Sequence, residues 1–586
     1  MSTSAVDRTA LDRGIFLGIG ALAGAAAYLL SEVLPDRVEN DHLLLLLIAA
    51  TGGFFSALLA ALGPLRLPRA VLAAAASSLP AAGLFYWASF RFQDVGDYLD
   101  TVHPAAAFAV IVSISLPFLI AAQRAGEGWR HYPSLFNHAW NIVVRYAAAW
   151  VFTGVFWGVV ALSDALFKLV GLDIIQKLLD IDFVPYVLTG ATLGLAMAVV
   201  VELSDYVSPF LILRLLRLLM PVILLVTAVF LVALPVQGLS DLFGGLSAAA
   251  TLLAMALGIA TLITSALDRR DDDAVDSRFM RLSAQLLALA LPVLAVLGGY
   301  AIWLRVAAYG WSPDRLAAAA VAAVVLGYGV FYALAVVLRG GWMARVRGVN
   351  TAMALVAVAI SVLWLSPVID PQRIAARDQV ARFERGAVGV AALDLWFIGR
   401  ELGVAGEAAI TRLAALDNPE AVALATRLAR LQEATSRYDF ERAVVDEQAP
   451  VIAGDLARQI AVLPEGYALP NDILGNLDAR RLLDISDGCQ ILTPAGNVGC
   501  VLVFADFLPH LDGDEGLLIY ATAPGKASLR VIGADRTGVE AVFLSGSRFT
   551  DIKPETIDAL LSGGYVLGPA QVPSLRIGGA EIIITP

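Results

Sequence analysis

The residues of this sequence best suited to chemistry are ionisable side chains that interrupt or end long apolar runs. Charged groups are costly inside a bilayer and commonly mark ion, proton or substrate pathways. Snorkelling to the membrane surface and local charge pairing are the competing interpretation. We favour this second interpretation, snorkelling and local pairing, because the middles of the runs hold almost no charge. The candidate functional residues are Arg145, Glu202, Asp205, Asp314 and Arg315.

The surroundings of these candidates favour pairing at the membrane surface over a pathway through it. Arg145 lies about one helical turn inside an apolar run, and Glu202 and Asp205 close the next run. Asp164 and Lys168 are four residues apart, so they can pair on one helix face. A carboxylate near the bilayer midplane would favour a proton-coupled transporter, and the sequence places none there.

Two segments resemble metal sites weakly, and neither predicts a cofactor. His131 and His138 share a helical face within residues 128–141, but no convincing third ligand accompanies them, so we expect an interfacial helix with aromatic anchors. Residues 510–515 resemble an acidic calcium loop but are too short, so a solvated turn is expected. A nucleophile elbow and a phosphate-binding glycine loop are both missing from the sequence, and we predict no catalytic residue.

The composition indicates a polytopic membrane protein. Of 586 residues, 59% are hydrophobic and only 16% are charged, and the net charge of −11 argues against a nucleic-acid partner. The first run is of full spanning length, so we expect a retained helix and not a cleaved signal. Proline at 80 and 221 leaves a re-entrant segment, and hence ten or twelve crossings, as the alternative to eleven. The predicted spans are 14–34, 43–62, 70–90, 104–122, 141–164, 185–203, 213–235, 246–267, 282–304, 315–338 and 349–367.

The distribution of basic residues predicts the orientation of these spans. The N-terminus and the even-numbered loops hold 15 arginines, whereas the odd-numbered loops hold five arginines and lysines. Basic loops stay in the cytoplasm, so the N-terminus is expected inside and the C-terminus outside the cytoplasm. Glycines at 14, 18, 20, 24, 190 and 194 have the small-xxx-small spacing of close helix contacts, which we assign to internal packing and not to dimerisation.

The last third of the chain has the composition of a soluble α+β domain. We expect a transmembrane domain over 1–368, a connector of three or four short helices over 369–440, and an extracytoplasmic domain over 441–586 with a small antiparallel β part. Strand patterns begin near 451 and include VGCVLVF, GLLIYAT, SLRVIGA and EIIITP. One helix over 553–561 interrupts them, opened by proline and glutamate.

The only two cysteines, Cys489 and Cys500, are predicted to form a disulfide. They flank a turn signal at 494–497, and two strands joined by that turn would bring the thiols together. An oxidising compartment favours the bond, which agrees with the arginine count although it is independent of it. Two unrelated buried thiols are the alternative.

Two short motifs carry a resemblance to a known family. They are Tyr309-Gly310-Trp311-Ser312-Pro313-Asp314-Arg315 and, after the final span, Asp370-Pro371-Gln372-Arg373-Ile374. With that span, they resemble an uncharacterised bacterial family of polytopic inner-membrane proteins, known only as a domain of unknown function of the 4153 type. The resemblance implies a location and an architecture, and it supplies no catalytic residues.

Three functions fit the sequence. The first, which we favour, is a non-enzymatic envelope protein that binds a partner, senses a signal or acts as a scaffold, in contact with membrane lipids and through its outer domain with an envelope protein. The second is a transporter or lipid-handling channel, because proline and glycine interrupt several spans. The third is a membrane enzyme acting on a lipid-linked substrate at Asp314 and Arg315.

Overall fold

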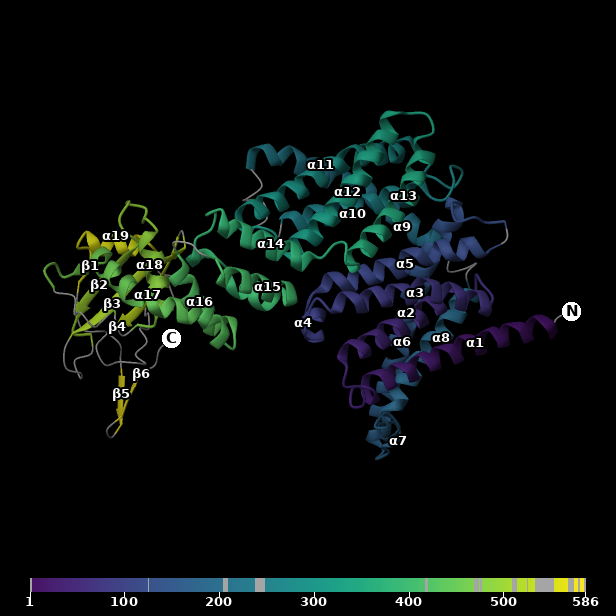
Figure 1. Ribbon diagram of the computed structural model, residues 1–586, viewed down its shortest axis with the longest axis horizontal. Coiled ribbons are helices and arrows are strands. Elements are labelled where there is room, and N and C mark those ends of the chain that lie inside the picture. Colours follow the sequence, from purple (N-terminus) through teal and green to yellow (C-terminus); the bar gives the residue numbers. More distant parts are fainter. Residues whose placement is uncertain are drawn as a thin grey trace. The chain divides into compact units, whose positions relative to one another are not determined.

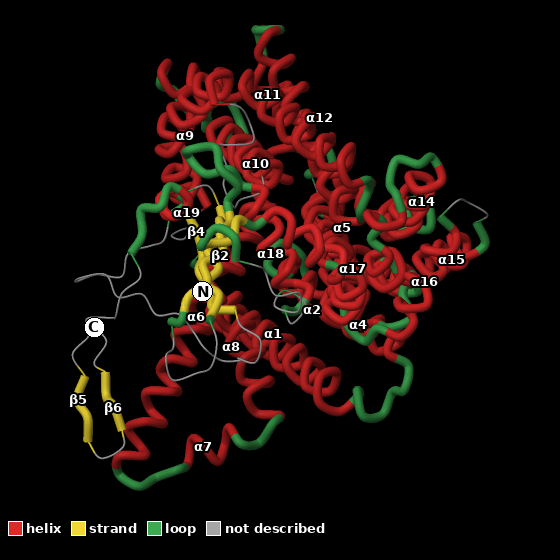
Figure 2. Tube along the Cα trace, turned by 90° about the vertical axis from the view of Figure 1, so that its left-hand side faces the viewer, coloured by secondary structure: helices red, strands yellow, loops and turns green. Residues whose placement is uncertain are grey.

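The chain folds into two compact units, residues 1–417 and 418–586. The computed structural model describes residues 3–124, 126–203, 209–237, 248–416, 420–467, 474, 477–507, 514–523, 525–532, 553–566, 574–577 and 580–583. The first unit is helical, and every named strand lies in the second (Figures 1 and 2). The boundaries expected at 368 and 440 stay predictions.

Eleven helices in the described residues are long and apolar enough to cross a membrane, as the sequence predicts. Asn40 caps one of them and Ser312 caps another, each side chain accepting a hydrogen bond from a backbone amide of the first turn. The helices are α1 (Thr3–Tyr28, continued by a π-helical turn to Val33), α2 (Asp41–Ala61), α3 (Leu67–Ser89), α5 (Val102–Gln123), α6 (Tyr132–Leu169), α8 (Phe183–Glu202), α9 (Pro209–Gln237), α10 (Ala248–Leu267), α11 (Arg278–Tyr309), α12 (Pro313–Val337) and α13 (Trp342–Leu365).

The alternative of a re-entrant segment and the expectation of a separate interfacial helix are both wrong, for one cause. Pro80 lies inside the continuous helix α3, and α9 likewise runs through its proline without a break. Helix α6 begins at Tyr132, so His138 belongs to a spanning helix and not to a separate interfacial one. In lipid, an intact helix satisfies the most backbone groups, which overrides a proline or a polar first turn.

The first and eighth helices, α1 and α8, are joined by the predicted glycine contacts (Figure 1). A Cβ atom on Gly20 would lie 2.1 Å from the carbonyl oxygen of Gly190, and one on Gly24 would lie 2.2 Å from that of Tyr186. A Cβ atom on Gly194 would come equally close to helix α1. Close backbone approach of this kind stabilises helix pairs in lipid. The prediction of internal packing is confirmed for these glycines, whereas Gly14 and Gly18 face open space.

The spanning helices bury two hydrophobic clusters, and α13 contributes to both. One cluster gathers residues of α1, α2, α3, α5, α6 and α8, together with Trp364 and Leu365 at the end of α13. The other gathers residues of α9 to α12, together with Val346 near the start of α13. Helix α13 therefore ties the two helix groups of the first unit together.

After α13, the chain stays with the first unit through α14 (Pro371–Glu384) and α15 (Gly403–Ala414), with a 3-10 turn at Val390–Ala392 and a π turn at Phe397–Glu401 between them. Gly310 has a φ of +77° and no room for a side chain, since a Cβ atom would lie 2.7 Å from the Asp378 carboxylate. That carboxylate accepts a 2.8 Å hydrogen bond from the Trp311 amide, and Gln379 donates to the Tyr309 carbonyl. The tyrosine-glycine-tryptophan motif thus forms part of the surface on which α14 packs.

Two short helices, α4 (Val95–Asp100) and α7 (Ile174–Leu179), lie between spans.

The second unit holds α16 (Ala421–Glu433), α17 (Arg437–Gln459), α18 (Ala479–Gln490) and α19 (Glu555–Leu561) beside strands β1 (Ala461–Leu463), β2 (Cys500–Ala505), β3 (Glu515–Ala523), β4 (Lys526–Ile532), β5 (Ser574–Ile577) and β6 (Ala580–Ile583). The main sheet has the order β1-β2-β3-β4, with β1 parallel to β2 and the other pairs antiparallel. Strand structure begins at 461 and not near 451, because α17 continues through Pro450. The expected helix over 553–561 is confirmed as α19, and the connector does hold three α-helices.

Cys489 and Cys500 form the predicted disulfide, with their Cα atoms 4.8 Å apart. The expected geometry is wrong in one respect, because Cys489 ends helix α18 and only Cys500 lies in a strand. Asp558 of α19 accepts hydrogen bonds from Thr493, Asn497 and the Ala495 amide, and these bonds hold the pKa of its carboxyl below the usual value. Residues 510–513 of the acidic segment lie outside the described residues.

Candidate functional site

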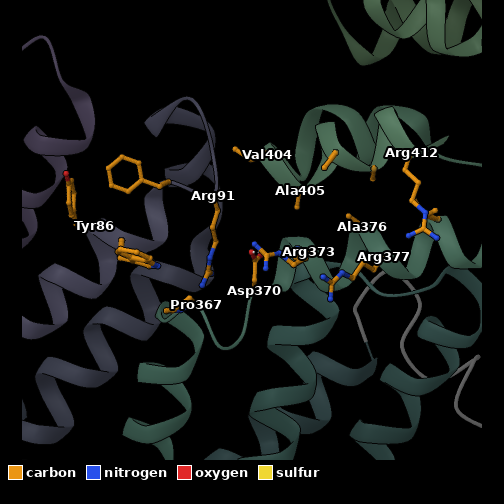
Figure 3. Close-up of a pocket in the computed structure, with 15 residues that line it drawn as sticks. Tyr86, Arg91, Pro367, Asp370, Arg373, Ala376, Arg377, Val404, Ala405 and Arg412 are labelled. Carbon is orange, nitrogen blue, oxygen red and sulfur yellow. Dashed lines mark hydrogen bonds and ion pairs between the residues drawn. The ribbon is translucent and has the colours of Figure 1, made fainter. Parts of the chain in front are cut away.

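A cavity of about 880 Å³ lies in the first unit where α3 and α13 end (Figure 3). We call it the basic groove. Four arginines and one aspartate line it, together with an aromatic wall at the end of α3 and a floor of small apolar residues on α14 and α15. The lining residues are Tyr86, Trp87, Phe90, Arg91, Pro367, Asp370, Arg373, Ala376, Arg377, Val380, Val404, Ala405, Ala408, Ala409 and Arg412.

Arg91 is the most firmly held cation of the groove. Its Nη2 atom donates to the carbonyl oxygens of Trp364, Ser366 and Ile369 at 2.9, 2.8 and 3.0 Å. Trp364 and Ser366 lie at the end of α13, where the helix leaves its last acceptors unsatisfied, and Ile369 lies in the loop that follows. The Nη1 atom is buried without a hydrogen-bond partner among the described residues. Burial lowers the pKa of Arg91, against an opposing effect of the nearby Asp370 carboxylate.

Helix α15 closes the groove by direct backbone contact with the Arg91 segment. The amide of Val404 donates to the Arg91 carbonyl at 3.0 Å. Gly403 has a φ of +54°, and a Cβ atom there would lie 2.3 Å from the same oxygen. Gln93 adds a bond from its Nε2 atom to the Glu407 carboxylate at 2.8 Å. Only glycine permits this approach, so position 403 sets the width of the groove.

The charges of the groove are unequally satisfied. Asp370 caps α14 by accepting from the Arg373 amide at 3.0 Å, and its carboxylate lies 3.5 Å from the Arg373 guanidinium. Arg412 pairs with Glu384 at 2.7 Å. Arg377 is exposed and has no ion pair or hydrogen bond with a described residue. Arg373 and Arg377 lie one helical turn apart, so they present two guanidinium groups on the same face of α14 (Figure 3).

The aromatic wall gives the groove an apolar side. Trp87 and Phe90 are 58% and 50% exposed, respectively, and Phe90 stacks on His42 with ring centroids 4.4 Å apart. Aromatic rings at the ends of spanning helices gather at the level of the lipid headgroups. The arrangement can therefore hold a molecule with an anionic head and an apolar body.

The predicted site residues that the structure describes lie outside the basic groove and are not gathered into one site. The guanidinium of Arg145 is buried and donates to the carbonyl oxygen of Leu62 at 3.1 Å, so it caps the end of α2. Glu202 pairs with Arg13 across the α1–α8 contact at 2.6 Å, and Asp205 lies outside the described residues. The predicted pair of Asp164 and Lys168 is confirmed at 2.8 Å.

Asp314 and Arg315 open helix α12, as the sequence predicts. Asp314 is exposed in the first turn. Arg315 donates from Nη1 to the Gly310 carbonyl at 2.8 Å and lies over the Tyr309 ring, so it holds the loop it follows. Neither residue lines the basic groove.

The arginines that do line the groove were not identified from the sequence. Arg91 appears there as a single charge in a loop, and its importance depends on carbonyl groups more than 270 residues away. A usable signal was present in α14, where Arg373 and Arg377 recur at helical spacing immediately after the last span.

The fold and the groove together define a multi-pass α-helical membrane protein with a basic, aromatic-walled groove at one end of its helices. Residues 20–413 match the family described as "Domain of unknown function (DUF4153)", and the chain belongs to it. The match ends just after Arg412, so it contains every residue that lines the groove. No curated protein and no solved structure matches the chain.

Proposed function

We propose that this protein is an envelope binding protein of the bacterial inner membrane that holds the phosphate-bearing headgroup of an anionic lipid in the basic groove. The observation that carries the proposal is the excess of four arginines over one aspartate in a groove that also has an aromatic wall. Guanidinium groups bind phosphate oxygens through paired, charge-assisted hydrogen bonds. The exposed guanidinium of Arg377 supplies donors for them, and Arg91 lines the same groove.

The position of the groove supports a ligand that comes from the bilayer. Both α3 and α13 are spanning helices, and the groove begins where they end. A lipid headgroup reaches this level while its acyl chains remain in the hydrocarbon, beside Trp87 and Phe90. Attraction of anionic lipid contributes about 1 kcal/mol for each basic side chain near the surface.

The orientation that we propose places the groove and the second unit outside the cytoplasm. The bias of arginine toward the N-terminus and the even-numbered loops supports it, as does the disulfide between Cys489 and Cys500. The second unit then offers a surface to an envelope protein on the same side as the bound lipid. A transporter or lipid-handling channel remains the alternative, and the enzyme hypothesis at Asp314 and Arg315 gains no added support from their contacts.

Lipid binding by the purified full-length chain tests the proposal. We expect native mass spectrometry in a neutral detergent to show saturable binding of phosphatidylglycerol and weak binding of phosphatidylcholine. Removing two cations with Arg373→Gln and Arg377→Gln together is expected to weaken phosphatidylglycerol binding about 10- to 30-fold. Arg37→Gln is the matched control, because Arg37 is exposed in a loop on the same side and lies outside the groove.

Two further arms identify the source of the phosphate. Displacement of the lipid by inorganic phosphate at low concentration would indicate a site for the free anion and not for a lipid. An equal loss for each charge removed in the Arg37 variant and in the double variant would show that only overall charge matters, and the proposed groove would be wrong.

The orientation is tested separately by protease treatment of intact spheroplasts. We expect added protease to digest the second unit without lysis. Digestion only after lysis would contradict the orientation while leaving the lipid-binding result intact.

A further inference from the structure

A second cavity, of about 470 Å³, lies among the spanning helices of the first unit. Helices α5 and α6 line one side, and α10, α12 and α13 line the other. These belong to the two helix groups that α13 ties together. The volume falls within the range of small-molecule pockets, about 300–1,000 Å³. We call it the tyrosine cavity, after Tyr132, Tyr328 and Tyr332 in its lining.

A cluster of neutral polar groups forms one wall of the tyrosine cavity. The Asn350 amide donates from Nδ2 to the Tyr132 hydroxyl at 3.0 Å and to the Thr264 hydroxyl at 3.3 Å. Its Oδ1 atom accepts a hydrogen bond from the buried Tyr332 hydroxyl. Residues from α6, α10, α12 and α13 thus meet at one amide, which fixes the geometry of the wall.

The hydrogen-bond inventory of this cluster leaves a donor unused. Both protons of the Asn350 amide are donated, Tyr332 donates to Asn350, and Thr264 donates to the Ala260 carbonyl at 2.8 Å, while the hydroxyl oxygens of Thr264 and Tyr332 also lie 3.2 Å apart. The Tyr132 hydroxyl accepts from Asn350, and its own proton has no acceptor among the described residues. A tyrosine hydroxyl in an apolar site normally finds a partner, so this proton is available to a ligand.

The remaining lining specifies the rest of the ligand. No aspartate, glutamate, lysine, arginine or histidine is among the residues that line the tyrosine cavity. Phe118, Phe136 and Trp140 add aromatic faces to those of the tyrosines. Flat apolar walls favour a planar ring, and an uncharged site within the span excludes a charged molecule.

We propose that the tyrosine cavity binds a neutral, membrane-soluble ring compound that carries a carbonyl oxygen, the chemical class of the isoprenoid quinones. The ring lies between the aromatic faces, and its carbonyl oxygen accepts a hydrogen bond from the Tyr132 hydroxyl. The apolar chain extends toward the lipid. This site is independent of the basic groove, because it shares no lining residue with it.

Equilibrium binding of a decyl-substituted benzoquinone to the purified full-length chain tests the inference. We expect one saturable site per chain, and Tyr132→Phe should weaken binding about five-fold by removing one hydrogen bond. Tyr146→Phe is the matched control, since the Tyr146 hydroxyl donates to the Ser56 carbonyl at 2.6 Å and does not line the cavity. Ala354→Phe, which fills the cavity, should abolish binding.

Other outcomes overturn the inference. Equal binding of the quinone by the Tyr132 and Tyr146 variants would show that the Tyr132 hydroxyl takes no part in binding. Equal binding of a decylbenzene without a carbonyl would show that the cavity takes any apolar chain, such as that of a bilayer lipid. If a variant fails to fold, a competition experiment on the unaltered chain takes its place. In that experiment decylbenzene must not displace the quinone.

Discussion

The basic groove and the tyrosine cavity lie in the same helical unit but offer opposite chemistry. The groove presents four arginines, one of which is anchored to three backbone carbonyls. The cavity presents an uncharged wall in which a single amide organises three hydroxyl groups. The comparison teaches that position along the helices decides which kind of donor the protein can use.

The physical cause of the difference is the cost of charge in the bilayer. The groove begins where α3 and α13 end, so its guanidinium groups can be hydrated or meet a headgroup. The cavity lies within the spans, where a charged side chain costs several kcal/mol but a hydrogen-bonded amide does not. Under the two proposals, charge distinguishes the ligands of the two sites before shape does.

The largest expected effect comes from Gly403→Val, which should remove the groove and leave the cavity intact. The added side chain would collide with the Arg91 carbonyl and strain a positive φ. We expect phosphatidylglycerol binding to fall about 30-fold, as measured by native mass spectrometry. Gly386→Val is the control, because Gly386 has a φ of +69° but open space around it. An equal loss in the control would assign the effect to backbone strain alone.

The next effect comes from Asn350→Leu, which should damage the cavity and spare the groove. Loss of the amide removes the Asn350 acceptor of the buried Tyr332 hydroxyl and leaves it only the Thr264 hydroxyl, 3.2 Å away. We expect a loss of about 1–3 kcal/mol in unfolding free energy, seen as a lower melting temperature, and about ten-fold weaker quinone binding. Thr351→Val, at a cavity position whose hydroxyl bonds only within its own helix, should change little. Unchanged melting in the Asn350 variant would contradict the role given to the amide.

Salt should weaken ligand binding at the groove but not at the cavity, and the effect should be smaller than that of the substitutions. Raising the ionic strength from about 0.05 M to about 0.5 M screens exposed charges. We expect phosphatidylglycerol binding at the groove to weaken about five-fold, while quinone binding at the cavity stays constant. Parallel titrations on one preparation measure both. A matching decline at both sites would indicate a general effect on the detergent-solubilised protein.

The smallest expected effect is that of pH, which should alter neither site between about pH 6 and pH 9. Arginine remains charged there, and the lowered pKa of Arg91 keeps the same sign of charge. No histidine is among the lining residues of either site. Binding titrations across this interval check the expectation. A midpoint near neutral pH would implicate a titrating group that neither lining contains.

Sequence reasoning recovered the number of spans and the role of the glycines, because both depend on local composition. Eleven apolar runs and the spacing of Gly190 and Gly194 are visible without knowledge of the fold. The disulfide was found for the same reason, although its helix-to-strand geometry was not. Residues 479–490 form a helix that the turn signals on either side concealed.

The basic groove could not be predicted, because its parts are joined only by the fold. Arg91 and Gly403 are isolated residues in the sequence. In the fold, the Arg91 guanidinium binds carbonyls at the end of α13 and beyond it, and Gly403 packs against the Arg91 carbonyl. Arg145 was a candidate functional residue because it lies inside an apolar run, yet its guanidinium caps the end of helix α2. The buried charge of Arg145 is therefore a structural cap, whereas three of the four arginines that line the groove follow the last span.

The glycine contact between α1 and α8 has a consequence for biogenesis. Four spanning helices separate these two partners along the chain. The ribosome therefore delivers α1 to the bilayer long before α8 exists. Until α8 is inserted, the bare backbone at Gly20 and Gly24 faces lipid, so the amino-terminal helix cannot reach its final place until the eighth helix is made.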